Sequence, residues 1–362
     1  MSQDIVAATQ SYEEWLATQV EIVAKDIATK HANMANSPFL FLRATYYRWA
    51  QTFPEVCPKI SVAPKVLAVG DLHCENFGTW RDAEGRLAWG VNDFDEAWDL
   101  PYTHDLVRLA TSLRLATAED GFGLAAEDAC ADLLDGYTKA VRSKRAAFVL
   151  EERHAHLRAL AEMNRGNSAA FWKKMTAQPA TDDIPEDVRF LLLDALPKKA
   201  GEVRLSTRVA GQGSLGRQRF VAVAELDGGL VAREAKAAAP SACSWATSVT
   251  GVPPLYERIL GEAVRCPDPF YALEQGRWVV RRLAPACSRI ELDTARRGPD
   301  RRKLVVSMGA EIANVHFGKG PLDAVAADLA ERSSSWLVKA SGKMEDQVRA
   351  DWKDWRRAFK GK

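Results

Sequence analysis

The chain has 362 residues, a net charge of +1 at pH 7, and contents of 47% hydrophobic and 27% charged residues. This composition is ordinary for a globular protein with a sizeable core, and the near-neutral charge gives no general attraction to nucleic acid or to anionic membranes. The apolar runs are too short to cross a bilayer, no apolar leader segment is visible near the first residue, and the six cysteines form no CxxC pair. We therefore expect a cytoplasmic protein with no nucleic-acid partner and no membrane partner.

Helical signals occupy both ends of the chain. Apolar residues recur at helical spacing in residues 1–53, 103–118, 124–164, 301–317 and 321–359. Thr103 is expected to cap the second of these regions.

Strand signals lie between the helical regions. Residues 64–70 and 87–92 are short apolar strands, and residues 270–283 predict a hairpin. Residues 202–236 alternate in polarity and contain two glycine turns, which predicts three strands. Helical segments on either side of a β-rich segment predict an α+β fold.

The stretch GDLHCENFG at residues 70–78 fits two kinds of chemistry. A binuclear-metal phosphoesterase uses Asp-x-His for its first ligands, but two metals need further blocks of ligands downstream. The chain has no second GD and no NH, so His73 lacks partner ligands for that chemistry. A kinase-like enzyme needs a base, an asparagine that binds magnesium and a second metal-binding aspartate. Asp71, Asn76 and Asp93 have the required order, and Asp95 adds negative charge nearby.

The stretch GQGSLG at residues 211–216 matches the pattern G-x-G-x-x-G. A Rossmann loop with this pattern leads from a strand into a helix. Here residues 217–226 favour a strand instead, which is typical of the flap that covers the phosphates in kinases. We interpret Gly211, Gly213, Ser214 and Gly216 as this nucleotide-binding flap.

A kinase-like site also needs a cation on the third strand. Arg233 and Lys236 are both available, but they lie three residues apart and face opposite sides of a strand, so only one can point at the phosphates. A glutamate on a helix normally holds this cation, and Glu257 or Glu262 is expected in that role.

The order of these parts is reversed with respect to a kinase, because the catalytic segment 71–93 precedes the flap. We therefore predict a circular permutation with its break just before the catalytic loop. The helix at residues 304–320 would then end near the start of that loop.

Several stretches together resemble the bacterial family catalogued as domain of unknown function 2252. They include SPFLFLRA, GDLHCENFG, VAGQGSLGRQRF, LVAREAKAAAPSA and MGAEIANVHFGKG. The catalytic block is also similar to the aminoglycoside and choline phosphotransferases. There a G-D-x-H-x-x-N loop is followed by a strand that ends in aspartate, and then by a helix with a buried aspartate.

The resemblance implies a kinase-like two-lobe fold, with a helical lobe and a small antiparallel β lobe. It implies that Asp71 is the base, that Asn76 and Asp93 bind magnesium, and that Asp105 is a structural acid below the loop. His73 would orient the base or shape the loop. The family usually has lysine where this chain has Arg233, and arginine is not equivalent to lysine at a packed phosphate site.

We predict a helical lobe with the catalytic loop in residues 1–200, a nucleotide-binding β lobe in 201–290 and helices in 291–362 that pack back on the first lobe. The predicted activity is ATP- and Mg²⁺-dependent phosphoryl transfer to a hydroxyl acceptor, by default a small molecule. One alternative is a nucleotide-binding pseudokinase that acts as a regulatory module. The other is transfer of AMP to protein hydroxyls.

Overall fold

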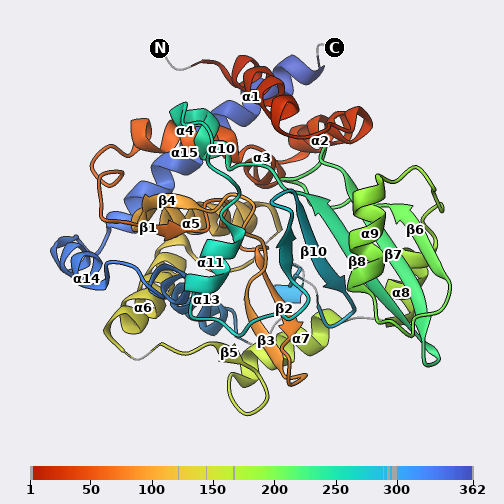
Figure 1. Ribbon diagram of the computed structural model, residues 1–362. Helices are drawn as coiled ribbons and strands as arrows, with labels where there is room; N and C mark the ends of the chain where they lie inside the picture. The colour runs from red at the N-terminus through yellow and green to blue at the C-terminus, as the bar shows by residue number, and fades with distance from the viewer. Residues whose placement is uncertain are drawn as a thin grey trace.

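The computed structural model describes residues 3–120, 122–143, 145–165, 168–287, 289–291, 294–295 and 300–360 (Figure 1). Within these residues the structure combines many helices with three small sheets, and all strand pairs in the sheets are antiparallel. This confirms the predicted α+β class with small antiparallel sheets.

The largest sheet has five strands in the order β6-β7-β8-β10-β9. The strands are β6 (Val203–Thr207), β7 (Arg219–Leu226), β8 (Gly229–Ala237), β9 (Ala272–Glu274) and β10 (Trp278–Leu283). The three strands predicted in 202–236 and the hairpin predicted in 270–283 are therefore confirmed. Side chains alternate between the two faces of this sheet, as the pleat requires.

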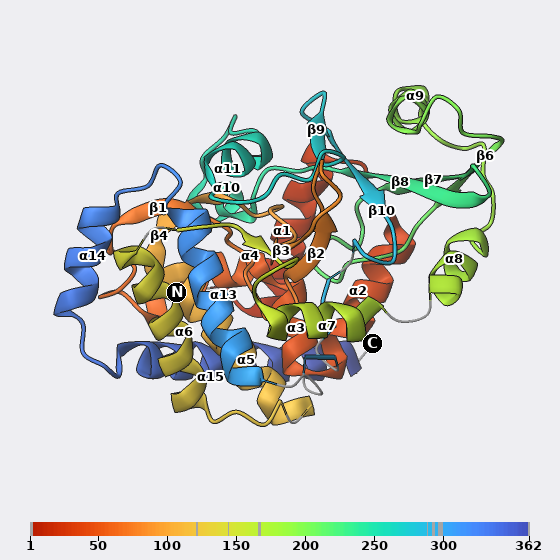
Figure 2. The same ribbon diagram turned by 90° about the horizontal axis from the view of Figure 1, so that it is seen from below.

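Two helices cover opposite faces of this sheet (Figure 2). The outer face packs its alanine, phenylalanine and tryptophan side chains under α9 (Glu186–Ala195). At the far end of the inner face, α8 (Ser168–Thr176) packs Met175 against Val221, Val223 and Leu283. The rest of the inner face carries charged side chains and faces the helical body.

The two smaller sheets belong to the helical body. β1 (Lys65–Ala68) pairs with β4 (Trp98–Pro101), and β2 (Phe77–Arg81), β3 (Leu87–Val91) and β5 (Phe148–Val149) form the third sheet. The strands predicted at 64–70 and 87–92 correspond to β1 and β3. The pattern of the sequence did not single out β2, β4 or β5, each of which has at most five residues.

Helices make up the remaining regular secondary structure of the described residues. They are α1 (Ile5–Gln19), α2 (Ala24–Asn36), α3 (Pro38–Ala44), α4 (Tyr46–Val56), α5 (Tyr102–Asp120), α6 (Ala126–Arg142), α7 (Ala155–Arg165), α10 (Ala242–Thr247), α11 (Tyr256–Glu262), α13 (Arg301–His316), α14 (Leu322–Glu331) and α15 (Trp336–Lys360). The helical regions of the prediction are thus confirmed in outline. The predicted domain boundaries near residues 200 and 290 stay predictions.

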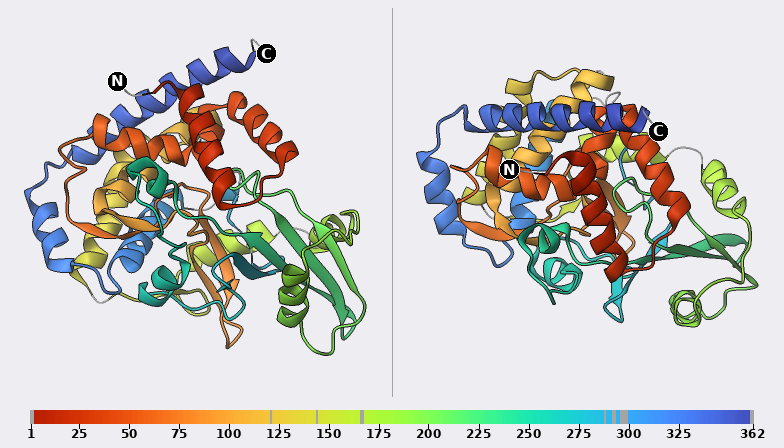
Figure 3. Two further views of the ribbon diagram at one scale, coloured as in Figure 1. Left: turned by 45° about the horizontal axis from the view of Figure 1, so that its top comes forward. Right: turned by 90° about the horizontal axis from the view of Figure 1, so that it is seen from above.

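The long helix α15 crosses the helical body and brings the last part of the chain to the first (Figure 3). It contacts α5 at the centre of the body as well as α1, α2, α3 and α4. α13 packs along α6. The two ends of the described chain therefore lie on the same side of the molecule.

Local chemistry explains where some helices begin. α3 begins after Ser37, whose hydroxyl oxygen accepts a hydrogen bond from Leu40 N at 3.2 Å, with Pro38 at the first helical position. The predicted cap of α5 is wrong. The helix begins at Tyr102, so Thr103 lies inside it and donates its hydroxyl to Ile60 O at 2.7 Å.

Within the described parts of the chain, no helix combines the length and the apolar character that crossing a membrane requires.

Candidate functional site

The loop after β1 carries the candidate base, and a buried aspartate fixes its shape. Gly70 has φ +81°, and a Cβ atom there would overlap the backbone oxygen of Glu96, so only glycine fits. Asp105 on α5 accepts hydrogen bonds from Val69 N at 2.7 Å and from Gly70 N at 3.0 Å. Asp105 is fully buried and also lies 3.0 Å from His316 Nε2. The predicted structural acid therefore lies directly below the loop.

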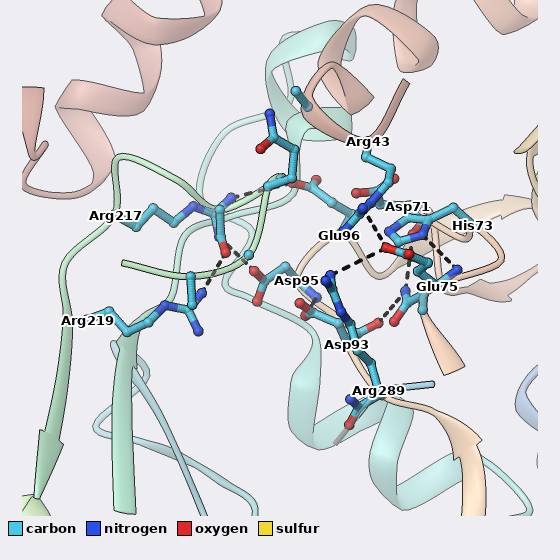
Figure 4. Close-up of a pocket in the computed structure, with 18 of the residues that line it drawn as sticks. Arg43, Asp71, His73, Glu75, Asp93, Asp95, Glu96, Arg217, Arg219 and Arg289 are labelled. Carbon is cyan, nitrogen blue, oxygen red and sulfur yellow. Dashed lines mark hydrogen bonds and ion pairs between the residues drawn. The ribbon is translucent and has the colours of Figure 1, made fainter. Parts of the chain in front are cut away.

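Asp71 follows Gly70 and points its carboxylate into the site (Figure 4). Its Oδ1 accepts hydrogen bonds from Arg108, with Nε at 2.9 Å and Nη2 also in contact. Arg108 is fully buried between the rings of Tyr46 and Trp49. Burial raises the pKa of Asp71, and the charge of Arg108 opposes this rise. Arg108 thus favours the ionised form of the candidate base.

Asn76 joins the two carboxylate loops. Its Nδ2 donates to Asp71 O and to Asp93 O, each at 3.1 Å. Its Oδ1 is buried and has no hydrogen-bond partner among the described residues. A buried carbonyl oxygen without a donor fits a hard cation such as Mg²⁺, which prefers oxygen ligands.

Asp93 accepts one of these hydrogen bonds through its backbone oxygen, and its side chain is 44% exposed. Burial of the group opposes its ionisation, but the charges of Lys236 and Arg281 outweigh this and lower its pKa to about 2. The neighbouring cations therefore favour the ionised form of Asp93. No group of three or more acidic, histidine or cysteine side chains that would form a metal cage occurs among the described residues. Magnesium held by one or two protein oxygens together with phosphate oxygens does not need such a cage.

Lys236 is the cation on the third strand that reaches this site. Its Nζ lies 3.3 Å from Asp93 Oδ1 and 2.6 Å from Asp95 Oδ1. Arg233 points to the other face of β8, where Nε donates to Ala195 O at the end of α9. The alternation of a strand therefore separates the two candidates, as expected.

The helical partner of Lys236 differs from both glutamates considered. Tyr256, the first residue of α11, places its hydroxyl 3.2 Å from Lys236 Nζ and also contacts Asp95. Glu262, at the other end of α11, lies at the surface and pairs with Arg258 at 3.3 Å. Asp93 and Asp95 thus take the place of a helical glutamate as partners of the lysine.

The glycine loop between β6 and β7 reaches across to Asp71. A Cβ atom at Gly213 would lie 3.3 Å from Asp71 Oδ2, so the tip of the loop meets the candidate base. Gly211 and Gly216 have φ values of +77° and +99°, which glycine adopts without strain. Ser214 accepts a hydrogen bond from Arg219 Nη2 at 2.7 Å.

The N-terminal helices hold this loop from its other side. Lys30 on α2 donates from Nζ to Gly213 O at 3.2 Å, and Val23 N donates to Gly216 O at 2.8 Å. Burial lowers the pKa of Lys30 to about 8. A flap that is anchored in this way has a defined position over the carboxylates.

These parts enclose one cavity of about 440 Å³. The predicted residues that line it are Asp71, His73, Asn76, Asp93, Asp95, Gly211, Gly213 and Ser214. The predicted residues that do not line it are Asp105, Gly216, Arg233, Lys236 and Glu262. Of these, Lys236 contacts two lining carboxylates, Asp105 supports the loop, and Gly216 lies within the flap.

Basic side chains that the sequence analysis did not single out also line the cavity. They are Lys30, Arg43, Lys174, Arg208, Arg217, Arg219, Arg281 and Arg289. Arg217 and Arg219 directly follow the glycine loop, so their position in the sequence was a usable signal. The others come from distant segments and have no local signature.

His73 lines the cavity and lies between Asp71 and Asn76 in the same loop. Burial, together with the charges of Arg43 and Arg108, holds its pKa well below the ordinary histidine value. Its Nδ1 accepts a hydrogen bond from Glu75 N at 3.2 Å. The neutral ring therefore shapes the loop between Asp71 and Asn76.

Comparison with known proteins gives one match. Residues 22–183 match the model of a bacterial family described as "Uncharacterized protein conserved in bacteria (DUF2252)", which confirms the resemblance over that range. The matched range includes Asp71, Asn76, Asp93 and Asp105, and it ends before the glycine loop. No curated protein and no solved structure matches the chain.

Proposed function

We propose that this chain, whose residues 22–183 match the DUF2252 family, is an ATP- and Mg²⁺-dependent phosphotransferase with a permuted kinase-like site. One observation carries the proposal: the loop with Asp71 and the flap line a single cavity, and the third-strand lysine contacts Asp93 and Asp95 in its wall. These are the parts that phosphoryl transfer requires, and they come from separate segments of the chain.

The packing around α13 supports the permuted order. His316 is the last residue of α13, and its Nε2 lies 3.0 Å from Asp105, which holds the start of the catalytic loop. The helix therefore ends beside that loop, as a break before the loop would require.

In the proposed reaction, the acceptor hydroxyl lies against Asp71. Asp71 accepts the proton of the hydroxyl, and the acceptor oxygen forms a bond to the γ-phosphorus. The bond from that phosphorus to the bridging oxygen breaks, and ADP leaves with the electron pair. Arg108 orients Asp71 and favours its ionised form.

Asn76 Oδ1 and the Asp93 carboxylate would hold the magnesium ion, whose chemistry is to neutralise charge on the phosphate oxygens. Lys236 and the backbone of the glycine loop would bind further phosphate oxygens. Most of the rate would come from positioning and from charge stabilisation.

One observation favours the second candidate, a nucleotide-binding regulatory module. Asp71 already has a strong partner in Arg108, so its oxygen is less basic than that of an unpaired carboxylate.

The third candidate is transfer of AMP to a protein hydroxyl, which would use the same site with attack on the α-phosphorus. The products of ATP turnover distinguish these activities.

The test is incubation with Mg²⁺ and ATP labelled at either the α- or the γ-phosphate, with water as the default acceptor. Phosphoryl transfer predicts ADP with γ-label in phosphate or an acceptor, and this activity falls in Asp71→Asn. Asp99→Asn is the matched control, since that side chain is 50% exposed and does not line the cavity. Transfer of α-label with release of pyrophosphate would indicate a nucleotidyl transferase. Tight binding without turnover would leave the regulatory module.

A further inference from the structure

Three arginines surround one buried glutamate on the inner face of the large sheet. Arg219 Nη1 lies 2.9 Å from Glu234 Oε1, and Arg281 Nε lies 2.8 Å from the same oxygen. Arg208, just after β6, contacts the other oxygen, Oε2. The cluster of Arg208, Arg219 and Arg281 therefore comes from three parts of the sheet and meets on β8.

This arginine cluster has an excess of positive charge. Burial of Glu234 opposes its ionisation, but the three arginines outweigh this and hold its pKa well below the ordinary value. Three guanidinium groups and one carboxylate leave a surplus of two positive charges. A single buried carboxylate does not need three cations, so neutralisation of Glu234 does not account for the cluster.

The surplus charge faces the cavity. All three arginines line it, and the side chains of Arg208 and Arg281 are each 22% exposed. The flap adds a further donor, because Gln212 Nε2 is buried and has no partner among the described residues. Forked guanidinium groups and an unused amide donor that line the same cavity are well suited to bind phosphate oxygens.

The position of the cluster relates it to the magnesium ligands. Glu234 precedes Lys236 by two residues on the same face of β8, which corresponds to a separation of about 7 Å along the strand. Lys236 in turn contacts Asp93 at 3.3 Å. Beyond the cluster, Phe171, Met175 and Leu283 give the cavity an apolar end. The charged inner face is therefore a track that leads away from Asp93.

We propose that this track binds a chain of phosphate groups, whose terminal group lies at Asn76, Asp93 and Lys236 and whose other groups lie on the arginine cluster. The inference rests on the proposed function, because the terminal group is the one transferred. A nucleoside triphosphate and inorganic polyphosphate share this chemistry. In the first case, the base would lie at the apolar end of the cavity.

The test is calorimetric binding of ATP, inorganic tripolyphosphate and adenosine, each with Mg²⁺, to the full chain. Tripolyphosphate is expected to bind and to compete with ATP, whereas adenosine binds far more weakly. Arg281→Gln is expected to weaken both phosphate ligands by about tenfold or more, because it removes a charge-assisted contact. Arg208 and Arg219 remain to pair with Glu234, so we expect the variant to fold, and thermal unfolding checks this.

Arg282→Gln is the matched control. Arg282 lies beside Arg281 on β10, is similarly buried at 20% exposure, and faces the opposite side, where it donates to Arg81 O. Equal effects of the two variants, or adenosine binding as tightly as ATP, would overturn the inference while leaving the phosphotransferase proposal intact. If tripolyphosphate binds and ATP does not, the inference is supported and inorganic polyphosphate is identified as the ligand. Failure of every phosphate compound to bind would overturn both proposals.

Discussion

Asp105 is expected to stabilise the whole loop that carries the candidate base Asp71, and the loss of stability in Asp105→Ala can be measured. The carboxylate accepts hydrogen bonds from Val69 N and Gly70 N and contacts His316 Nε2, all of which are buried. A buried donor that loses its acceptor costs about 1–3 kcal/mol. Because three donors are affected and small shifts recover part of the loss, we expect Asp105→Ala to lower the free energy of unfolding by about 3–5 kcal/mol.

The assay is urea denaturation of the wild type and the variant at pH 7 and at pH 3. Burial opposes ionisation of Asp105, but its contacts with His104 and His316 outweigh this, so folding lowers its pKa. The stabilisation is therefore fully present above the unfolded carboxyl pKa of about 3.9 and declines as pH falls below it. Asp135→Ala is the control, since that side chain is 44% exposed and should change stability by less than about 0.5 kcal/mol. A loss at Asp105 no larger than at Asp135 would refute this account of the loop.

Three further predictions concern the glycine loop, the candidate base and the helix behind that loop. Gly216→Ala places a Cβ atom on the Ile27 side chain and should cost about 2–4 kcal/mol by denaturation, whereas Gly228→Ala, at a similar positive φ in open space, should cost about 1 kcal/mol. Equal losses would show that the Ile27 contact is unimportant. Arg108→Lys loses the paired contacts with Asp71, so the pKa of Asp71 should rise further and the acid limb of the pH–rate profile should move to higher pH. Arg114→Lys on the same helix should leave the profile unchanged. Burial lowers the pKa of Lys30 to about 8, whereas an unfolded lysine titrates near about 10.4. Between these two pKa values the unfolded chain therefore binds more protons than the folded chain. The free energy of unfolding of the wild type, relative to that of Lys30→Met, should increase from pH 8 to pH 10. A difference between the two proteins that does not change with pH would contradict the burial of this amine.

The sequence was most informative where the chemistry lies in one contiguous stretch. Asp71, Asn76 and Asp93 lie together in the site because only short strands and tight turns connect them. The glycine pattern at 211–216 was interpretable because the residues after it form a strand, now seen as β7. In these places local geometry determines which side chains meet.

Elsewhere the site depends on packing that no local pattern reveals. Alternation along β8 predicts only that Arg233 and Lys236 face opposite sides of the sheet. Which of them faces the cavity depends on which face of β8 is covered by α9. Tyr256 replaces the expected glutamate because α11 presents its first residue, and not its last, to Lys236. Arg43 and Arg281 come from a distant helix and a distant strand. Nothing in the sequence around them distinguishes them from arginines that are exposed to solvent.

Arg219 shows that a further inference was within reach. It lies three residues after Gly216, the end of the glycine loop, and is in phase with Val221 and Val223, which face inward on β7. A cation in that phase next to a flap predicts an inward-facing arginine. Its two companions, Arg208 and Arg281, become visible only when the strand order of the sheet is known.

The central claim is that Asn76, Asp93 and Lys236 form one metal–nucleotide site. Its most direct test is calorimetric titration of ATP, with and without Mg²⁺, into the wild type, Asp93→Asn and Asn76→Ala, with folding confirmed by thermal unfolding. Binding to the wild type is expected to depend on Mg²⁺ and to weaken by tenfold or more in either variant, at about 1.4 kcal/mol per factor of ten. Binding that is equally tight without Mg²⁺, or that is unchanged in both folded variants, would contradict the claim.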